Sequence, residues 1–450
     1  MRICEQLCLF GAILCALCVE TKAAKTDRPE VSPAAAQTRP EAASPYGLCA
    51  HLTAGERDER PRTLDAARAV GARMVRCDFW WSEIERLDGS FGFSLTDAVV
   101  ADAKAAGITI LPILGNGHPR HGAPFEDEAP WRRYVHAVAE RYAADCPVFE
   151  VWNEPDVAPS GRGCQNPTNY VAVLKAAAEE IRAAAPGARI ASGGTAGVST
   201  ARVWAYIGNV LSLGGGDWFD IINVHAYSTP SAPEKQYSGF GSFPRRLRVL
   251  MTLSGCGEKP IWNTEFGWPT NETDPEWPTD DKEFLNGKVG VDEESQAIWT
   301  ARALGCAFAE GVALMMPYEL RDRGGSPFDR ESRFGLLHED FSPKPAFYAY
   351  KTFTAMRPAG SAQKEGAYFD GGFFFPQWRR PDGEPAGMLW TTGAPDTRTL
   401  RFVASTKRSP QPRFFNHLGR EFFPDKTAGG FAIPVSDAPI YFVGAELASP

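Results

Sequence analysis

Two glutamates in the sequence stand at the ends of apolar runs with unusual neighbours. The first, Glu154, follows the run 148–152, and the second, Glu265, ends the run that begins at residue 261. If both runs are strands of a parallel barrel, their carboxyl ends open onto one face, and strands four and seven lie across from each other. The two carboxylates would then meet in one cleft. Such a pair can supply the protonated and the ionised carboxyl that cleavage of a glycosidic bond needs.

Four polar residues are candidates for supporting this pair. Asn153 lies directly before the first glutamate, Arg76 lies in the second apolar run, and His225 and Tyr227 lie at the end of the sixth. An arginine beside the second glutamate would favour its ionised form, although it could also be a purely structural ion-pair partner. His225 could be a satisfied core histidine or a functional one, and Asn153 could be a turn residue.

Aromatic residues follow the same apolar runs. Trp80 and Trp81 come after the second run, and Trp268 comes after the seventh. Aromatic rings at such places can stack against sugar rings, or they can simply pack in the core. Both interpretations stay open for each tryptophan.

The elements that must position these residues follow from an alternation of apolar runs and amphipathic stretches. Stretches with helical spacing separate the runs and cover 63–69, 95–106, 131–143, 170–185 and 294–309. The alternation predicts an α/β fold, a (β/α)8 TIM barrel over residues 45–357. A doubly wound sheet is the alternative, but the glycine-rich phosphate turn that usually follows its first strand is missing from the sequence. The eight runs are 47–52, 73–77, 108–114, 148–152, 189–192, 221–225, 261–264 and 312–316.

The pattern changes after about residue 357. Short aromatic and β-branched runs are separated there by Gly, Pro, Asp and Asn, which is typical of strands joined by turns. Residues 358–450 are therefore predicted to form a small all-β sandwich. The runs are 373–375, 388–390, 400–403, 413–415 and 440–443.

These motifs together resemble the clan A glycoside hydrolases, the superfamily of retaining β-glycosidases with catalytic glutamates on strands four and seven. The nearest likeness is to family 39 and family 5 type enzymes that carry a C-terminal β-sandwich. The motif Asn-Glu-Pro at 153–155 and the motif Glu-Phe-Gly-Trp at 265–268 carry this resemblance. It implies that Glu154 is the general acid/base and Glu265 the nucleophile. It also implies that Asn153 binds the sugar 2-hydroxyl.

The resemblance extends to further positions. The His-Ala-Tyr motif at 225–227 matches a strand-six His-x-Tyr, in which Tyr227 would donate a hydrogen bond to the nucleophile. Arg76 matches a strand-two arginine beside the nucleophile. On strand eight, many members place a tryptophan as the floor of the cleaved-sugar subsite. This chain departs from that pattern, and Tyr318 is expected to take the tryptophan's place.

Composition limits the classes of function. The chain has 450 residues, with 47 Lys and Arg against 55 Asp and Glu and a formal net charge of -8. Because an acidic chain without a basic stripe has no source of phosphate neutralisation, we expect no nucleic-acid partner. No metal site is predicted, since a His-Glu-x-x-His motif is missing, and no cofactor is predicted.

The N-terminal segment predicts export. An apolar run at 7–19 is too short to span a bilayer and fits a signal peptide over residues 1–23. Residues 24–44 are rich in Pro, Ala, Thr, Glu and Arg and are predicted to be a disordered linker. We therefore expect a secreted or periplasmic protein without a membrane span. Six cysteines follow the signal segment, and their pairing cannot be deduced from their spacing.

The leading hypothesis is a secreted retaining glycoside hydrolase that cleaves β-glycosidic bonds of a poly- or oligosaccharide by double displacement. One alternative is a non-catalytic carbohydrate-binding barrel protein. Another is a transglycosylase that uses the same two glutamates. The sugar, the linkage, endo or exo action and the oligomeric state stay open.

Overall fold

The structure, a computed structural model, describes residues 44–53, 59–157, 162–228, 230–239, 241–273, 290–404 and 411–449. The predicted signal peptide at 1–23, and all but the last residue of the predicted linker at 24–44, lie outside these ranges. None of the helices in the described ranges combines the length and the apolar character needed to cross a bilayer.

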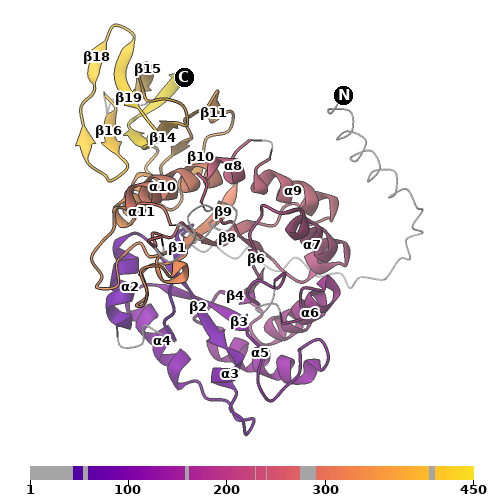
Figure 1. Cartoon of the computed structure of the whole chain (residues 1–450). Helices are drawn as coiled ribbons and strands as arrows, with labels where there is room; N and C mark the ends of the chain where they lie inside the picture. The colour runs from indigo at the N-terminus through magenta and orange to yellow at the C-terminus, as the bar shows by residue number, and fades with distance from the viewer. Residues whose placement is uncertain are drawn as a thin grey trace, which may run out of the picture. The chain divides into compact units, whose positions relative to one another are not determined.

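Short parallel strands form the centre of the first part of the chain, and helices surround them (Figure 1). One sheet contains five strands and a second contains four. Most residues of these strands are buried, which is why the strands appear in the sequence as continuous apolar runs. The first sheet consists of β1 (Gly47–Cys49), β2 (Met74–Trp80), β3 (Thr109–Gly115), β4 (Val148–Val151) and β5 (Arg189–Ser192). The second consists of β6 (Thr195–Ala196), β7 (Ile222–His225), β8 (Ile261–Phe266) and β9 (Val312–Pro317).

The edges of the two sheets meet at two isolated parallel bridges, Tyr46 with Met315 and Ala191 with Ile221. The described strands therefore form two parallel sheets rather than one continuous sheet of eight strands. Their ladders do not form the predicted closed barrel, although two bridges connect the edges of the sheets. All eight predicted strands are confirmed, and the two-residue β6 is an additional one. A single apolar cluster draws on both sheets, with Leu111 and Val148 from the first and Trp262 and Leu314 from the second.

Helices connect the strands. All five predicted helices are confirmed with shifts of a few residues at their ends. Side-chain caps begin several of them; for example, the Asp127 carboxylate accepts a hydrogen bond from the Ala129 amide at 3.2 Å. The longer helices are α2 (Arg60–Ala69), α4 (Ser94–Ala105), α5 (Glu128–Tyr142), α6 (Pro167–Ala184), α7 (Ala201–Ser212), α9 (Phe243–Leu253), α10 (Glu293–Ala309) and α11 (Pro345–Met356). Two further helices, α3 (Trp81–Ile84) and α8 (Glu234–Tyr237), have four residues each.

The last part of the chain forms two antiparallel sheets. One contains β10 (Ala362–Gln363), β11 (Phe369–Asp370), β12 (Phe373–Phe374), β13 (Gln377–Arg379), β14 (Pro385–Thr391), β16 (Arg413–Asn416), β17 (Glu421–Phe422) and β20 (Ile440–Val443). The other contains β15 (Asp396–Ala404), β18 (Asp425–Thr427), β19 (Gly430–Val435) and β21 (Ala445–Ser449). All five runs predicted in this region are strands.

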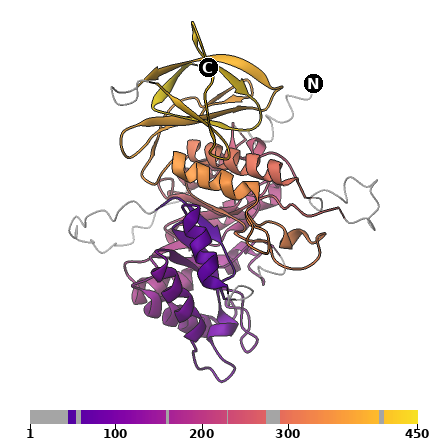
Figure 2. The same cartoon turned by 90° about the vertical axis from the view of Figure 1, so that its left-hand side faces the viewer.

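Apolar side chains from both antiparallel sheets, such as Leu389, Phe442, Leu400 and Ile433, share one core. Figure 2 shows these sheets next to the helices α10 and α11. The contact is aromatic: the Phe353 ring of α11 lies 6.1 Å from Trp378 and 6.3 Å from Tyr441, measured between ring centroids. The antiparallel part of the prediction is therefore confirmed.

Candidate active site

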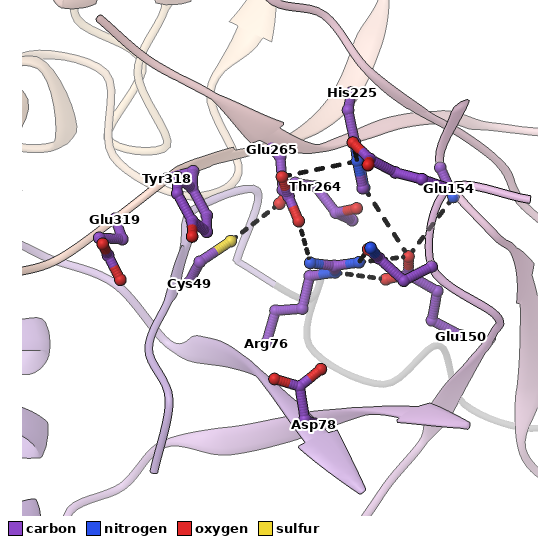
Figure 3. Close-up of polar contacts among 12 residues, drawn as sticks. Cys49, Arg76, Asp78, Glu150, Glu154, His225, Thr264, Glu265, Tyr318 and Glu319 are labelled. Atoms are coloured by element: carbon purple, nitrogen blue, oxygen red, sulfur yellow. Dashed lines mark hydrogen bonds and ion pairs between the residues drawn. The ribbon is translucent and has the colours of Figure 1, made fainter. Parts of the chain in front are cut away.

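The two glutamates predicted to act together line one cleft with a volume of 570 Å³. Glu265 lies on β8, and Glu154 lies three residues beyond the end of β4. One oxygen of each carboxylate and a ring nitrogen of His225 all lie within 4.8 Å of one another. In Figure 3, Arg76 lies between Glu265 and Glu150. His225 lies beside both Glu154 and Glu265. The structure therefore brings together residues that are 111 positions apart in the chain.

Both oxygens of Glu265 accept hydrogen bonds. Arg76 Nη1 donates to Oε1 at 2.5 Å, and the Tyr227 hydroxyl donates to Oε2 at 2.7 Å. The Glu265 side chain is otherwise enclosed, with 8% of the residue exposed. The guanidinium and the hydroxyl donor therefore fix the orientation of this buried carboxylate.

Arg76 is itself held by a second, fully buried carboxylate. Its Nε and Nη2 donate to the two oxygens of Glu150 at 2.8 and 2.9 Å, and Nη2 also donates to Asn153 Oδ1 at 2.7 Å. Burial lowers the pKa of the guanidinium, but the charges of Glu150 and Glu265 outweigh burial and raise it well above its usual value. Arg76 therefore stays charged, and its planar group links Glu150, Asn153 and Glu265.

The backbone around Glu154 turns sharply. Trp152 has φ of 77° and Glu154 has φ of 44°, both in the left-handed region that residues other than glycine rarely adopt. Such conformations cost of order 1 to 3 kcal/mol each and persist only where the surroundings hold them. Here the Trp152 amide donates to the Leu114 carbonyl at 2.7 Å, and the Tyr170 hydroxyl donates to the Val151 carbonyl at 3.2 Å. These contacts hold the turn that directs Glu154 into the cleft.

Glu154 shares a hydrogen bond with a titratable partner. His225 Nδ1 lies 3.0 Å from Glu154 Oε1 and 3.5 Å from Glu265 Oε2. Burial would raise the pKa of Glu154, but the hydrogen bond and charge of His225 outweigh it and lower that pKa. Burial would lower the pKa of His225, whereas the charge of Glu265 and the bond to Glu154 raise it. In the free protein, one proton is therefore shared between His225 and Glu154, closer to the imidazole.

Two of the four predicted aromatic residues reach the cleft. Trp80, the last residue of β2, and Tyr318, just beyond β9, both line it. The Tyr318 hydroxyl accepts a hydrogen bond from Arg323 Nη2 at 2.7 Å, which orients the ring.

The other two predicted aromatic residues lie in the core. Trp81 is fully buried, stacks on Tyr134 with 5.5 Å between ring centroids, and donates its indole N–H to Glu85 at 2.6 Å. Trp268 is buried and donates to the Ser231 carbonyl at 3.0 Å. Neither is among the residues that line the cleft. Their polar groups are satisfied by the protein, so the packing interpretation holds for both.

Several site residues were not predicted. Glu150 is the most informative: a charged residue inside the short apolar run of β4 is a signal that the sequence does contain. His51 was also missed; its Nδ1 and Nε2 lie 3.3 Å from Asp78 and 3.3 Å from Glu319. Burial would lower the pKa of His51, but these carboxylates raise it to about 10. His51, Asp78 and Tyr318 all line the cleft. The His51–Asp78 pair is therefore a second set of charged side chains in the cleft, besides Arg76 and the two glutamates.

The six cysteines that follow the signal segment are all free and buried. One of them, Cys49, donates its thiol hydrogen to the Thr264 carbonyl at 3.0 Å, directly beside Glu265. Burial raises the pKa of this thiol well above its usual value, so it stays protonated. The cysteines in the described chain are therefore core residues, as predicted for Cys77 and Cys306.

Known structures with a similar fold were found, although no protein-family model and no curated protein matches the chain. A family 39 glycoside hydrolase from Bacteroides cellulosilyticus WH2 aligns with a TM-score of 0.72 and 23% identity, over 89% of this chain and 80% of that one. The catalytic domain of a family 30 xylanase from Talaromyces cellulolyticus has a TM-score of 0.59, 12% identity and coverage of 89% and 96%. A family 51 α-L-arabinofuranosidase from Bifidobacterium longum has a TM-score of 0.54, 14% identity and coverage of 87% and 91%. The chain thus has the fold of these glycoside hydrolases, in agreement with the resemblance found in its sequence.

Proposed function

We propose that this protein is a retaining glycoside hydrolase that cleaves β-glycosidic bonds of a poly- or oligosaccharide. The observation that carries this proposal is the pair of carboxylates in one cleft, with oxygen atoms within 4.8 Å of each other. Retaining enzymes hold their two carboxyl groups about 5 to 5.5 Å apart, whereas inverting enzymes need about 6.5 to 9.5 Å to accommodate a water. The close approach favours the retaining reaction.

In the first step, Glu265 attacks the anomeric carbon and Glu154 assists the leaving group. A bond forms between a Glu265 oxygen and the anomeric carbon while the glycosidic C–O bond breaks, and the leaving oxygen takes a proton from Glu154. Arg76 and Tyr227 hold the Glu265 carboxylate in position before the reaction through hydrogen bonds of 2.5 and 2.7 Å.

In the second step, water releases the sugar. Glu154, now ionised, takes a proton from a water molecule, whose oxygen attacks the anomeric carbon as the bond to Glu265 breaks. The sugar leaves with its original anomeric configuration, and both carboxyl groups return to their starting states.

His225 supplies the proton for this cycle in the free enzyme. Because its pKa is raised and that of Glu154 is lowered, the pair retains one proton near neutral pH. Transfer of this proton from His225 across the 3.0 Å contact protonates Glu154, which can then act as the acid when a glycosidic oxygen is near it. Asn153 accepts from Arg76 through Oδ1, so its amide N–H groups are left for a sugar hydroxyl next to the scissile bond.

We also propose an architecture and a location for the protein. We take the two parallel sheets, bridged at Tyr46–Met315 and Ala191–Ile221, as the wall of a (β/α)8 barrel over 45–357. The two antiparallel sheets with their shared core support a β-sandwich over 358–450. The signal peptide at 1–23 and the linker at 24–44 make the protein secreted or periplasmic.

A covalent-trapping experiment tests the mechanism. The purified protein is incubated with a panel of 2-deoxy-2-fluoro β-glycosides that have dinitrophenolate as the leaving group. With these reagents the glycosyl-enzyme forms faster than water releases it. We expect a mass increase of one fluoroglycosyl group on the peptide that contains Glu265, and none on the Glu265→Gln variant. The matched control, Glu258→Gln, changes an exposed glutamate and should be labelled like the wild type.

Product analysis gives an independent result. NMR of the first sugar released from an aryl β-glycoside should show the β-anomer before mutarotation. Initial release of the α-anomer, together with the absence of labelling, would contradict the retaining mechanism. Adding an acceptor sugar separates hydrolysis from transglycosylation, because only the latter forms a new glycoside as its main product.

A further inference from the structure

A second cavity adjoins the catalytic cleft on the far side of Tyr227. It has a volume of 380 Å³, and Ser199 and Tyr227 line both spaces. We call this second cavity the side pocket. The Tyr227 hydroxyl donates a hydrogen bond to Glu265, so a single side chain separates the side pocket from the proposed nucleophile. The helices α8 and α9 contact each other and contribute Gln236 and Phe243, among other residues, to the lining of this cavity. A sugar chain in the cleft could therefore extend into the side pocket.

Two cations line the side pocket without ionic partners among the described residues. They are Lys235 on α8 and Arg246 on α9. Glu234, the acidic neighbour of Lys235, is directed elsewhere, because both its oxygens bond to Arg302 at 2.6 Å and one accepts from Trp390 at 2.9 Å. The described lining contains no acidic side chain. The side pocket is thus a local positive region on a chain whose formal net charge is -8.

Arg246 is oriented by an aromatic ring rather than by a carboxylate. Its guanidinium carbon lies 4.1 Å from the centroid of the Trp204 ring. Trp204 is itself fixed, since its indole N–H donates to the Val198 carbonyl at 2.8 Å. Burial lowers the pKa of Arg246, with no opposing acid to raise it. Arg246 is exposed at the wall of the side pocket, and no carboxylate of the described residues forms an ion pair with it.

Buried polar groups of the side pocket also lack partners. Ser228, which is 7% exposed, has a hydroxyl with no hydrogen-bond partner among the described residues. The amide of Gln236 donates to the Tyr227 carbonyl at 2.7 Å, whereas its buried Oε1 has no partner in the same part of the chain. Unsatisfied buried groups are rare unless a ligand or water completes them. A hydroxyl and an amide oxygen are the partners that sugar hydroxyls need.

We propose that the side pocket is a subsite for an acidic sugar unit, one that carries a carboxylate or a sulfate. The anion would lie between Lys235 and Arg246, and its ring hydroxyls would bond to Ser228 and Gln236. This step rests on the proposed function, which makes the ligand of the neighbouring cleft a sugar. It narrows the substrate class to charged poly- or oligosaccharides.

Binding measurements test the subsite without requiring turnover. The Glu265→Gln protein is titrated with D-glucuronate, glucose 6-sulfate and D-glucose, and ligand-observed NMR gives the three affinities. We expect at least one anion to bind about tenfold more tightly than glucose at low salt, and this preference to shrink in 0.5 M NaCl, since salt screens exposed charges. Preference for glucuronate identifies a uronic acid, and preference for glucose 6-sulfate identifies a sulfated sugar.

Variants assign the preference to the side pocket. Lys235→Gln combined with Arg246→Gln should abolish it, whereas Lys235→Arg alone should keep it because the charge is retained. The matched control, Lys426→Gln with Arg133→Gln, removes two exposed cations elsewhere and should leave the preference unchanged. Equal affinity for all three sugars, or a preference that survives the first double variant, overturns the proposal.

The failure of this proposal can be told apart from failure of the proposed function. If the anionic sugar binds in the side pocket but no aryl β-glycoside is hydrolysed and no fluoroglycoside labels Glu265, the hydrolase assignment is wrong and the subsite stands. If aryl glycosides are hydrolysed but anions show no preference, the hydrolase stands and the subsite is wrong.

Discussion

Glu265 on β8 and Glu154 beyond β4 share one cleft, yet the groups that hold them differ in kind. Glu265 is held by Arg76 and Tyr227, neither of which changes its charge near neutral pH, and Arg76 is held in turn by the buried Glu150. Glu154 lies on a left-handed turn, and its hydrogen-bond partner His225 is titratable. The comparison shows how the surroundings of two identical side chains can differ: one carboxylate is held by groups that keep their charge, and the other bonds to a group that gains and loses a proton.

The largest effect should come from removing the anion itself. Glu265→Gln keeps the shape of the side chain but removes the proposed nucleophile, so kcat on any aryl β-glycoside should fall by about 10⁴-fold or more. Steady-state kinetics measure this loss, and an unchanged melting curve shows that the fold is intact. Wild-type turnover by this variant would make the assignment of the nucleophile wrong.

The next largest effect should distinguish the proton-exchanging side. Glu154→Ala removes the general acid, which is worth about 10² to 10⁴-fold when the leaving group needs protonation. We expect a loss of that size for a methylumbelliferyl or alkyl glycoside and a much smaller loss in the first step for a dinitrophenyl glycoside. Pre-steady-state rates with both leaving groups give the comparison. Equal losses would show that Glu154 does not act as the acid.

Breaking the support of the fixed side should cost stability. Glu150→Ala leaves the Arg76 guanidinium buried with two hydrogen bonds lost, and removing one partner of a buried ion pair costs about 3 to 5 kcal/mol. Urea unfolding followed by fluorescence measures the free energy of unfolding. Glu258→Ala, at an exposed position, is the control and should change it little. A loss below about 1 kcal/mol for Glu150→Ala would mean that Arg76 does not depend on this carboxylate.

A smaller effect is expected from the second donor to Glu265. Tyr227→Phe deletes one hydrogen bond to a charged group, worth about 1.5 to 3 kcal/mol, so kcat/KM should fall by about 10 to 100-fold. Tyr348→Phe changes an exposed ring and is the control. An unchanged kcat/KM for Tyr227→Phe would show that Arg76 alone orients the nucleophile.

The smallest change should be a shift of the pH profile. In the wild type, the shared proton is lost only as pH rises through the raised pKa of His225, above its ordinary value of about 6.5. In His225→Gln, the proton is held by the Glu154 carboxyl alone, whose ordinary pKa is about 4.3. The alkaline limb of kcat/KM should therefore move to lower pH. A limb at the wild-type position would show that another group holds the proton.

Much of the fold could be predicted because its elements are locally encoded. Eight of the nine described parallel strands and five helices were predicted, since buried strands are continuous apolar runs and the helices carry Ala, Glu, Arg and Lys at helical spacing. The helices α7, α9 and α11 were missed. Each carries β-branched or aromatic residues that pack against neighbours, such as Trp204 on α7 and Phe353 on α11, and that packing outweighs weak local propensity.

The aromatic residues show where sequence reasoning fails. Trp80 and Trp81 are adjacent, yet one lines the cleft and the other is buried against Tyr134. At the end of β2 the chain changes from strand to helix, so the two side chains diverge. No pattern of residue types determines which of the two faces the cleft, because that depends on what packs behind the strand.

By itself, the sequence determined the chemical inventory: the two glutamates, Arg76, Tyr227 and the strands that carry them. Residue type and the period of apolar runs are local properties, so they can be read along the chain. Only the tertiary structure decided how each group is held. Glu150 bonds to Arg76, which lies 74 positions away in the sequence, and His225 bonds to Glu154, which lies 71 positions away. Glu234 is paired with Arg302, whereas its neighbour Lys235 lacks an ionic partner among the described residues. Charge and proton affinity depend on distance and burial, and these are properties of the folded molecule.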